Sequence, residues 1–146
     1  MLRINDIIEK IENGFTDTTE SQFEKDFWKS IQIPLKPQHK VANIRADFIV
    51  QGTNIVIECD GREFHESAEA TVNDRLRDHI FHHNGYRVIR IDGHTFYHSP
   101  DKVIWYVSKL INDNLVGEET EYVNMWHVDK GEKEIFNRNN KTLNLL

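Results

Sequence analysis

Residues 45–65 read RADFIVQGTNIVIECDGREFH, and this stretch predicts a β-hairpin. Both arms are rich in Val, Ile and Phe, and Gly52 with its polar neighbours marks the turn between them. A loop of either two or four residues around Gly52 gives the same register, because each arm shortens by one residue. In that register Asp47 lies opposite Glu58, so the hairpin brings two acidic residues together.

The same register assigns each side chain to a face, because side chains alternate along a strand. One face is apolar throughout and is expected to form the core side; it consists of Ala46, Phe48, Val50, Ile55, Ile57 and Cys59. The other face carries the acids, and consists of Arg45, Asp47, Ile49, Val56, Glu58 and Asp60. Gly61 ends the strand directly after the last acid, so we expect the acids to lie at a strand end.

Two facing carboxylates are unfavourable on a strand pair, since like charges directly opposite each other are destabilising. A hard divalent cation such as Mg²⁺, which prefers carboxylate oxygens, would relieve the repulsion between Asp47 and Glu58. Without a cation, one of the two carboxyl groups is expected to have a raised pKa. The alternative is a solvated acidic pair, with Arg45 opposite Asp60 offsetting part of the charge. The spacing alone leaves both interpretations open, and His65 in the following loop favours the metal site.

Length and composition fit one globular domain of 146 residues, 38% of which are hydrophobic. No stretch approaches the roughly 18–20 apolar residues of a membrane span, so no membrane partner is expected. The first 14 residues have scattered charges and lack the apolar block of a signal peptide, which predicts a cytoplasmic location. The single cysteine, Cys59, excludes an internal disulfide and a cysteine-based zinc site, and is expected to be a buried thiol.

The net charge of −6 weighs against nucleic-acid binding, but the charge is unevenly distributed. Residues 31–116 hold ten Lys or Arg and eleven Asp or Glu, which is close to neutral. Arginines gather after the hairpin, and arginine suits phosphate contacts; they are Arg62, Arg75, Arg77, Arg87 and Arg90. Ion pairing on helix surfaces is the alternative use for each of them.

The order of predicted elements is helix, β-hairpin, helix, strand and helix, which predicts an α/β (α+β) fold with one sheet covered by helices. A helix between two strands favours a crossover and parallel pairing. Helices are expected over 4–12, 20–31, 73–84 and 100–114, and strands over 44–50, 54–60, 86–92 and, more weakly, 36–44 and 121–128. Residues 93–99 are expected to form a loop. We expect a single domain over 1–116 and an extension of open role over 117–146.

Several of these segments together resemble the PD-(D/E)xK, or restriction-endonuclease-like, nuclease superfamily. The chain is more narrowly similar to the bacterial family called domain of unknown function 559, a relative of the very-short-patch-repair endonucleases. The resemblance covers about residues 20–100. It rests on Glu24 with Trp28, Asp47-Phe48, IECDG with His65, and the segments NDRLRD and GYRVIRI.

The resemblance implies a four-stranded mixed sheet flanked by helices and Mg²⁺- or Mn²⁺-dependent cleavage of phosphodiester bonds. Asp47 and Glu58 match the metal-binding acids of the superfamily, and the backbone carbonyl of Cys59 would be a third ligand. Glu24 matches an early-helix acid of the superfamily that reaches the site, either as a ligand of a second metal ion or as a partner of the ligating groups.

Asp60 departs from the superfamily pattern, because it stands where a lysine usually assists water activation. The related repair endonucleases also lack that lysine, and have one histidine at the position of Asp60 and a second at the position of His65. His65 is therefore the leading candidate for a general base or a phosphate contact. Arg62 and Arg77 are the candidate phosphate-binding residues.

The main functional hypothesis from the sequence is a small metal-dependent endonuclease or nickase that acts on DNA. A catalytically inactive nuclease-fold module that binds nucleic acid or protein is one alternative, and an RNA nuclease is another. With one site per chain, cleavage of both DNA strands would need a homodimer or two sequential nicks.

Overall fold

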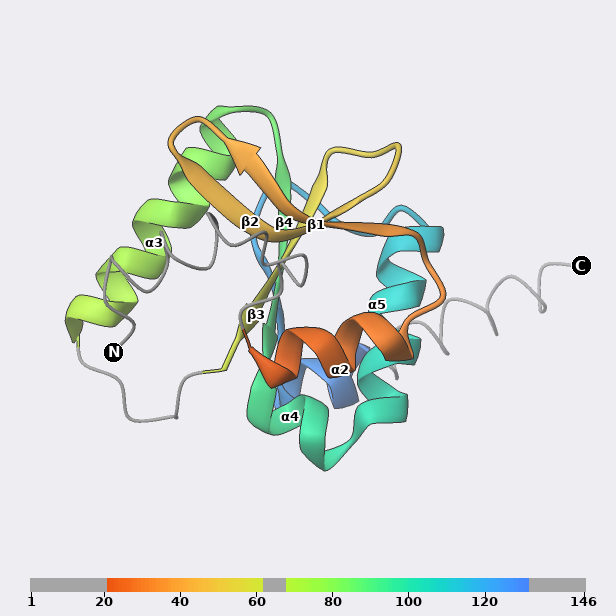
Figure 1. Ribbon diagram of the computed structural model, residues 1–146. Coiled ribbons are helices and arrows are strands. Elements are labelled where there is room, and N and C mark those ends of the chain that lie inside the picture. Colours follow the sequence, from red (N-terminus) through yellow and green to blue (C-terminus); the bar gives the residue numbers. More distant parts are fainter. Residues whose placement is uncertain (1–20, 62–67, 132–146) are drawn as a thin grey trace, which may run out of the picture.

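The computed structural model describes residues 21–61 and 68–131, so the helix expected over 4–12 lies outside the described residues. Helices and strands alternate along this part of the chain (Figure 1). In order they are α2 Gln22–Ser30, β1 Leu35–Val41, β2 Ile44–Val50, β3 Ile55–Asp60, α3 Ala68–His83, β4 Arg87–Asp92, α4 Gly93–His98, α5 Pro100–Asn112 and β5 Glu121–Val123. None of the helices within these residues is long and apolar enough to cross a membrane.

The strands form one mixed sheet of five strands in the order β1-β2-β3-β4-β5. β1, β2 and β3 pair antiparallel, whereas β3 with β4 and β4 with β5 pair parallel. The parallel pairing of β3 with β4 across α3 confirms the predicted crossover. The resemblance implied four strands, and the sheet has a fifth because β5 returns beside β4.

The predicted hairpin register is confirmed, since Phe48 pairs with Ile57 and Ile49 pairs with Val56. Gly52 has a φ of 79°, a left-handed conformation that glycine adopts without steric cost. The turn is closed by Thr53, whose backbone N–H donates to the Val50 carbonyl oxygen over 3.1 Å.

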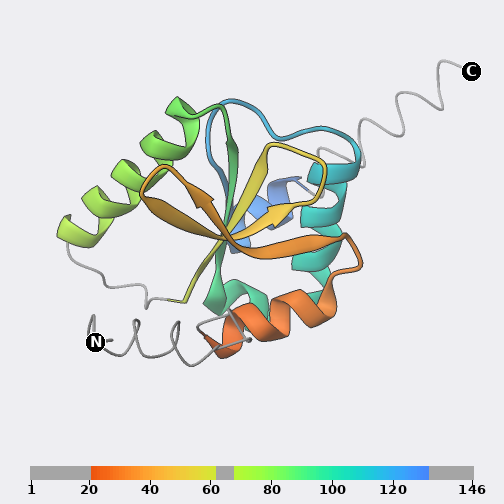
Figure 2. The same ribbon diagram turned by 45° about the horizontal axis from the view of Figure 1, so that its top comes forward.

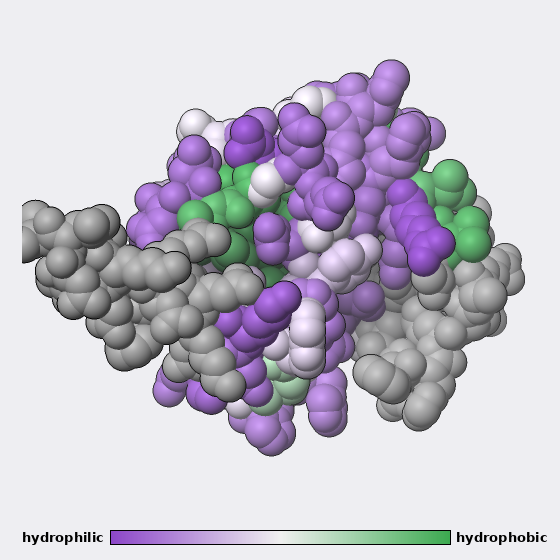
Figure 3. All heavy atoms as spheres, turned by 180° about the vertical axis from the view of Figure 1, so that it is seen from behind, coloured by the Kyte–Doolittle hydropathy of each residue, from purple (hydrophilic) through white to green (hydrophobic). Residues whose placement is uncertain are grey.

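Helices cover both faces of the sheet, with α3 on one side and α2, α4 and α5 on the other (Figures 1 and 2). The larger core lies beneath α2, α4 and α5 and includes Phe27, Phe48, Ile57, Phe96 and Val107. A smaller cluster lies beneath α3 and consists of Val41, Ala46, Val56, Phe81 and Val88. Ala46 therefore packs in the smaller cluster, unlike its predicted neighbours on the apolar face. Hydrophilic residues cover much of the outer surface seen from behind (Figure 3).

Two predicted boundaries were wrong. The segment 93–99 was expected to be a loop, but Gly93–His98 forms α4, whose N-cap Asp92 accepts a hydrogen bond from the Thr95 backbone N–H over 3.0 Å. A Cβ on Gly93 would lie 3.1 Å from the Phe23 ring, so the glycine lets α2 and α4 approach closely. α3 begins at Ala68 rather than at 73.

Residues beyond 116 contribute to this sheet and core. Val123 of β5 and Val128 are both buried in the larger core cluster, and residues 125–131 are helical. The side chains of Tyr122 and Trp126, by contrast, lie at the surface.

Candidate active site

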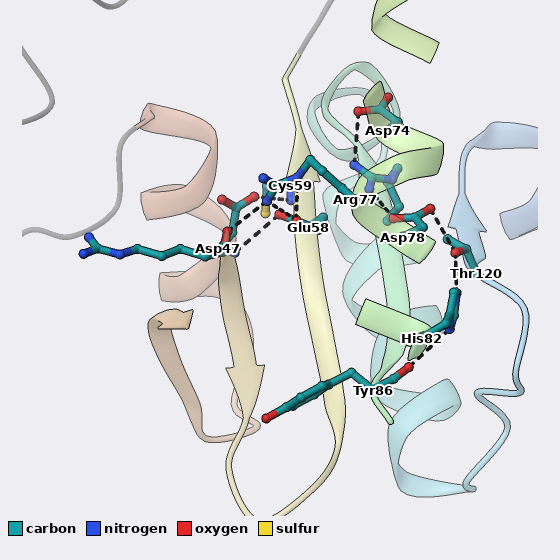
Figure 4. A network of polar contacts seen from close by, with 11 residues as sticks. Asp47, Glu58, Cys59, Asp74, Arg77, Asp78, His82, Tyr86 and Thr120 are labelled. Carbon is teal, nitrogen blue, oxygen red and sulfur yellow. Dashed lines mark hydrogen bonds and ion pairs between the residues drawn. The ribbon is translucent and has the colours of Figure 1, made fainter. Parts of the chain in front are cut away.

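Asp47 and Glu58 lie opposite each other at the end of the β2–β3 ladder. At this end, backbone N–H groups donate to carboxylates across the two strands (Figure 4). The Cys59 backbone N–H donates to Asp47 Oδ2 over 2.7 Å, and the Asp47 backbone N–H donates to Glu58 Oε2 over 3.4 Å. Glu58 is only 3% exposed, and Asp47 is partly buried. Each carboxylate therefore accepts one hydrogen bond from the neighbouring strand.

Arg77 of α3 neutralises the Glu58 carboxylate. Its Nη2 lies 2.5 Å and its Nε lies 3.2 Å from Glu58 Oε1, and Nη2 also donates to the Arg45 carbonyl oxygen over 2.8 Å. The sequence suggested that Arg45, opposite Asp60, would offset the charge of this face. The structure instead brings in Arg77, which was predicted to contact phosphate.

Glu24 adds a third carboxylate near the hairpin acids. It projects from the first turn of α2 and is 5% exposed. Burial raises the pKa of Asp47 well above its ordinary value, and the charges of Glu58 and Glu24 raise it further. This is the direction expected for facing acids. Ionising Asp47 therefore costs more free energy in the folded protein than it does in water.

Cys59 lies among these carboxylates, partly buried at the edge of the larger core. Burial raises the pKa of its thiol well above the ordinary value, and the charges of Asp47, Glu24 and Glu58 act in the same direction. The thiol therefore stays protonated near neutral pH and is a poor nucleophile.

Asp60 ends β3 and is paired with Asp92 of β4 in the parallel ladder. His65 and Arg62, the other predicted site residues, lie outside the described residues. Within residues 21–61 and 68–131, no three His, Cys, Asp or Glu side chains are arranged so that they could hold a metal ion by themselves.

A buried ion pair whose partners were not predicted from the sequence joins α3 to β4. The Arg90 guanidinium pairs with Asp78, and its Nη1 lies 3.7 Å from Asp74 Oδ1. Thr120 donates to Asp78 Oδ2 over 3.0 Å, and His82 Nε2 lies 3.1 Å from Thr120 Oγ1 (Figure 4). The segments NDRLRD and GYRVIRI therefore include residues whose side chains join α3 to the sheet. The spacing of Asp74 and Asp78, one helical turn apart, is the signal that could have identified this pair.

Comparison with known protein families identifies the family to which the chain belongs. A model of the restriction-endonuclease-like family REase_MTES_1575 matches residues 23–111. The chain belongs to this restriction-endonuclease-like family. The matched span includes Glu24, Asp47, Glu58 and Asp60, and the superfamily resemblance read from the sequence is confirmed. No curated protein matches the chain.

The fold is that of a nuclease catalytic domain. The structure is similar to the catalytic domain of the homing endonuclease I-Bth0305I, with a TM-score of 0.50 and 22% sequence identity. The match covers 64% of this chain and 97% of that domain. At this identity the similarity establishes the shared α+β fold, with its mixed sheet flanked by helices.

Proposed function

We propose that this member of the restriction-endonuclease-like family is a divalent-metal-dependent endonuclease or nickase that hydrolyses phosphodiester bonds in DNA. The observation that carries the proposal is the arrangement of the acids: Asp47 lies opposite Glu58 on the β2–β3 ladder, and Glu58 and Glu24 are only 3% and 5% exposed. Arg77 offsets the charge of Glu58, and a divalent cation would offset the charge that Asp47 adds beside it.

The donor set fits Mg²⁺ or Mn²⁺, because both ions favour carboxylate and carbonyl oxygens. Asp47 and Glu58 would hold the ion. The backbone carbonyl of Cys59 would be a further ligand: its N–H points to Asp47, and the N–H and C=O of one strand residue point to the same side. Water would complete the coordination, as is usual for Mg²⁺. The ion would compete with Arg77 for the Glu58 carboxylate.

A bound divalent ion offsets the charge of the scissile phosphate and lowers the pKa of a bound water. The residues of the chain supply the rest. His65 would take the proton from the attacking water, since an imidazole exchanges protons near neutral pH. Asp60 would orient that water as a hydrogen-bond acceptor, in place of the usual lysine. Arg77, when Glu58 holds the cation, would turn its donors to the phosphate together with Arg62.

A non-catalytic binding module is the second possibility, and the Arg77–Glu58 ion pair favours it. An arginine that permanently neutralises Glu58 would satisfy this acid without any metal. Calorimetric titration with Mn²⁺ separates the two: no binding at millimolar concentration supports the module. Competition between DNA and RNA of the same sequence tests the RNA nuclease alternative.

Cleavage of supercoiled plasmid with Mg²⁺ or Mn²⁺ tests the proposal. Asp47→Asn and Glu58→Gln should each reduce the rate by more than the roughly 10- to 100-fold that loss of a supporting residue costs. Glu118→Gln, which changes an exposed acid in the same way, is the control and should leave the rate unchanged. Open-circular product indicates nicking, whereas linear product indicates a homodimer or paired nicks. Unchanged cleavage by both site variants would refute the assignment.

A further inference from the structure

A cavity of about 190 Å³ lies where β3, β4 and β5 end, beside the proposed metal site. Its lining includes Asp60, Asp74, Arg90, Asp92, Tyr122 and Asn124. Of the residues that line it, the proposed function uses Asp60 alone. Its volume is below the roughly 300–1,000 Å³ of pockets for drug-sized ligands, so it suits a single ring system.

The register of the sheet connects the cavity to Glu58. Glu58 pairs with Arg90 and Arg90 pairs with Tyr122, so these three residues form one row across β3, β4 and β5. Asp60 and Asp92 are paired two positions further along, on the same face. The cavity therefore lies on the same face of the sheet as Glu58, and its nearest wall, Arg90, is on the strand next to that carboxylate.

The wall of the cavity contains a buried donor. Arg90 is 7% exposed, and its Nη atoms are directed to Asp78 and Asp74. Its Nε has no hydrogen-bond partner among the described residues. This nitrogen has less than 1 Å² of accessible surface and does not open into the cavity, so Arg90 contributes its positive charge to the wall of the cavity rather than a donor to a ligand.

Exposed aromatic side chains continue from the mouth of the cavity. Tyr122 is 43% exposed and Trp126 is 63% exposed. The His127 ring lies between them, with its centroid 6.3 Å from that of Tyr122 and 4.8 Å from that of Trp126. The Lys130 ammonium lies 4.9 Å from the centre of the Trp126 ring. Aromatic rings with a neighbouring cation are typical of surfaces on which unpaired bases stack.

We propose that this cavity and its aromatic rim bind unpaired nucleobases of the substrate next to the scissile phosphate. The inference rests on the proposed function only in taking the substrate to be a nucleic acid. The carboxylates of the cavity repel a phosphate but accept hydrogen bonds from the amino group of a base. One base enters the cavity beside Tyr122, and the next stacks on Trp126. The favoured substrate is then single-stranded or locally unpaired DNA.

Fluorescence anisotropy with labelled 15-nucleotide probes tests this inference without cleavage, in EDTA and again with Ca²⁺. The probes are oligo-dC, an abasic strand of equal length, and a blunt duplex. Wild-type protein should bind oligo-dC more tightly than the other two. Tyr122→Ala and Trp126→Ala should each weaken binding of oligo-dC by about 5- to 150-fold, the range found for loss of one stacked base, and leave abasic binding unchanged. Trp105→Ala, which removes a tryptophan that is 39% exposed on α5, is the matched control.

Equal binding of all three probes, absence of binding, or unchanged oligo-dC binding by both aromatic variants would overturn the inference. Thermal unfolding of each variant excludes a trivial loss through misfolding. Trp126 is more exposed than Tyr122, so Trp126→Ala is the variant that should disturb folding least. The inference can fail while plasmid cleavage still depends on Asp47 and Glu58. It can also hold if no cleavage is found, because binding is measured without turnover.

Discussion

The guanidinium of Arg77 donates two hydrogen bonds to one oxygen of the Glu58 carboxylate, from Nη2 at 2.5 Å and from Nε at 3.2 Å. Glu58 is nearly inaccessible to water, with 4% of its side chain exposed, whereas 35% of the Arg77 side chain is exposed. A buried carboxylate needs such a partner or a cation. Arg77 therefore stabilises the protein without metal and competes with metal for the same group.

Replacing Arg77 with alanine separates these two effects. Arg77→Ala should lower the free energy of unfolding by about 1–3 kcal/mol in EDTA, because the buried Glu58 carboxylate loses its charged donor. The same variant should bind Mn²⁺ more tightly than wild type. Urea unfolding and calorimetric titration measure the two quantities, with Arg75→Ala as the control from the same helix. Weaker Mn²⁺ binding by Arg77→Ala would contradict the competition.

Asp47 predicts an unusual pH dependence of stability. Its pKa in the folded protein is raised from 3.8, chiefly by burial and then by Glu58 and Glu24. The native state therefore binds more protons than the unfolded chain above pH 3.8, and this group lowers the free energy of unfolding as pH rises through that window. Ionised Asp47 is thus a destabilising group at neutral pH in the absence of metal.

The measurement is urea unfolding in EDTA between pH 4 and 8 for wild type and Asp47→Asn, whose amide oxygen can still accept from the Cys59 N–H. The stability advantage of Asp47→Asn should grow with pH. Mg²⁺ should abolish that advantage by stabilising wild type alone. A difference that does not vary with pH would show that Asp47 has an ordinary pKa.

The ion pair of Arg90 with Asp78 should matter far more for stability than ion pairs at the surface. Both side chains are 8% exposed, and removing one partner of a buried pair costs about 3–5 kcal/mol. Asp78→Asn is therefore expected to lower the free energy of unfolding by about that amount. Lys102→Ala, which removes an exposed pair with Asp129, should cost less than about 1 kcal/mol. Similar costs for the two variants in denaturant titrations would argue against the structural role of Arg90.

His65 is expected to act in the proton transfer rather than in metal binding. His65→Ala should lower kcat by about 10²- to 10⁴-fold, the usual contribution of a general acid or base, with Mn²⁺ affinity unchanged. The rate of wild type should fall below neutral pH, and this fall should disappear in the variant. If Asp60→Asn instead removes the pH dependence and His65→Ala retains it, Asp60 is the base.

The short-range features of the fold could be predicted from the sequence. A turn at Gly52 fixes the hairpin register, and the register brings Asp47 opposite Glu58. These predictions succeed because they depend on neighbours within one hairpin, where alternation and loop length leave few choices. The resemblance to the restriction-endonuclease-like superfamily followed from this hairpin together with Glu24 and the segments NDRLRD and GYRVIRI.

Long-range relationships could not be predicted in the same way. The partner of Glu58 is Arg77, which lies 19 positions later and reaches it only because α3 crosses the sheet. α4 was missed because a six-residue helix that begins with glycine has little helical pattern, although its cap at Asp92 was a readable signal. The parallel pairing of β5, and with it the cavity beside Arg90, depends on a return of the chain that no local pattern specifies.

Crystals grown with MnCl₂ offer the most direct measurement, because the anomalous scattering of manganese locates the ion without reference to activity. The proposed function predicts an anomalous peak between Asp47 and Glu58, at about 2.0–2.6 Å from carboxylate oxygens of both residues, with Arg77 displaced from Glu58. Ordered density for both side chains with the Arg77–Glu58 ion pair intact and no anomalous peak would contradict it.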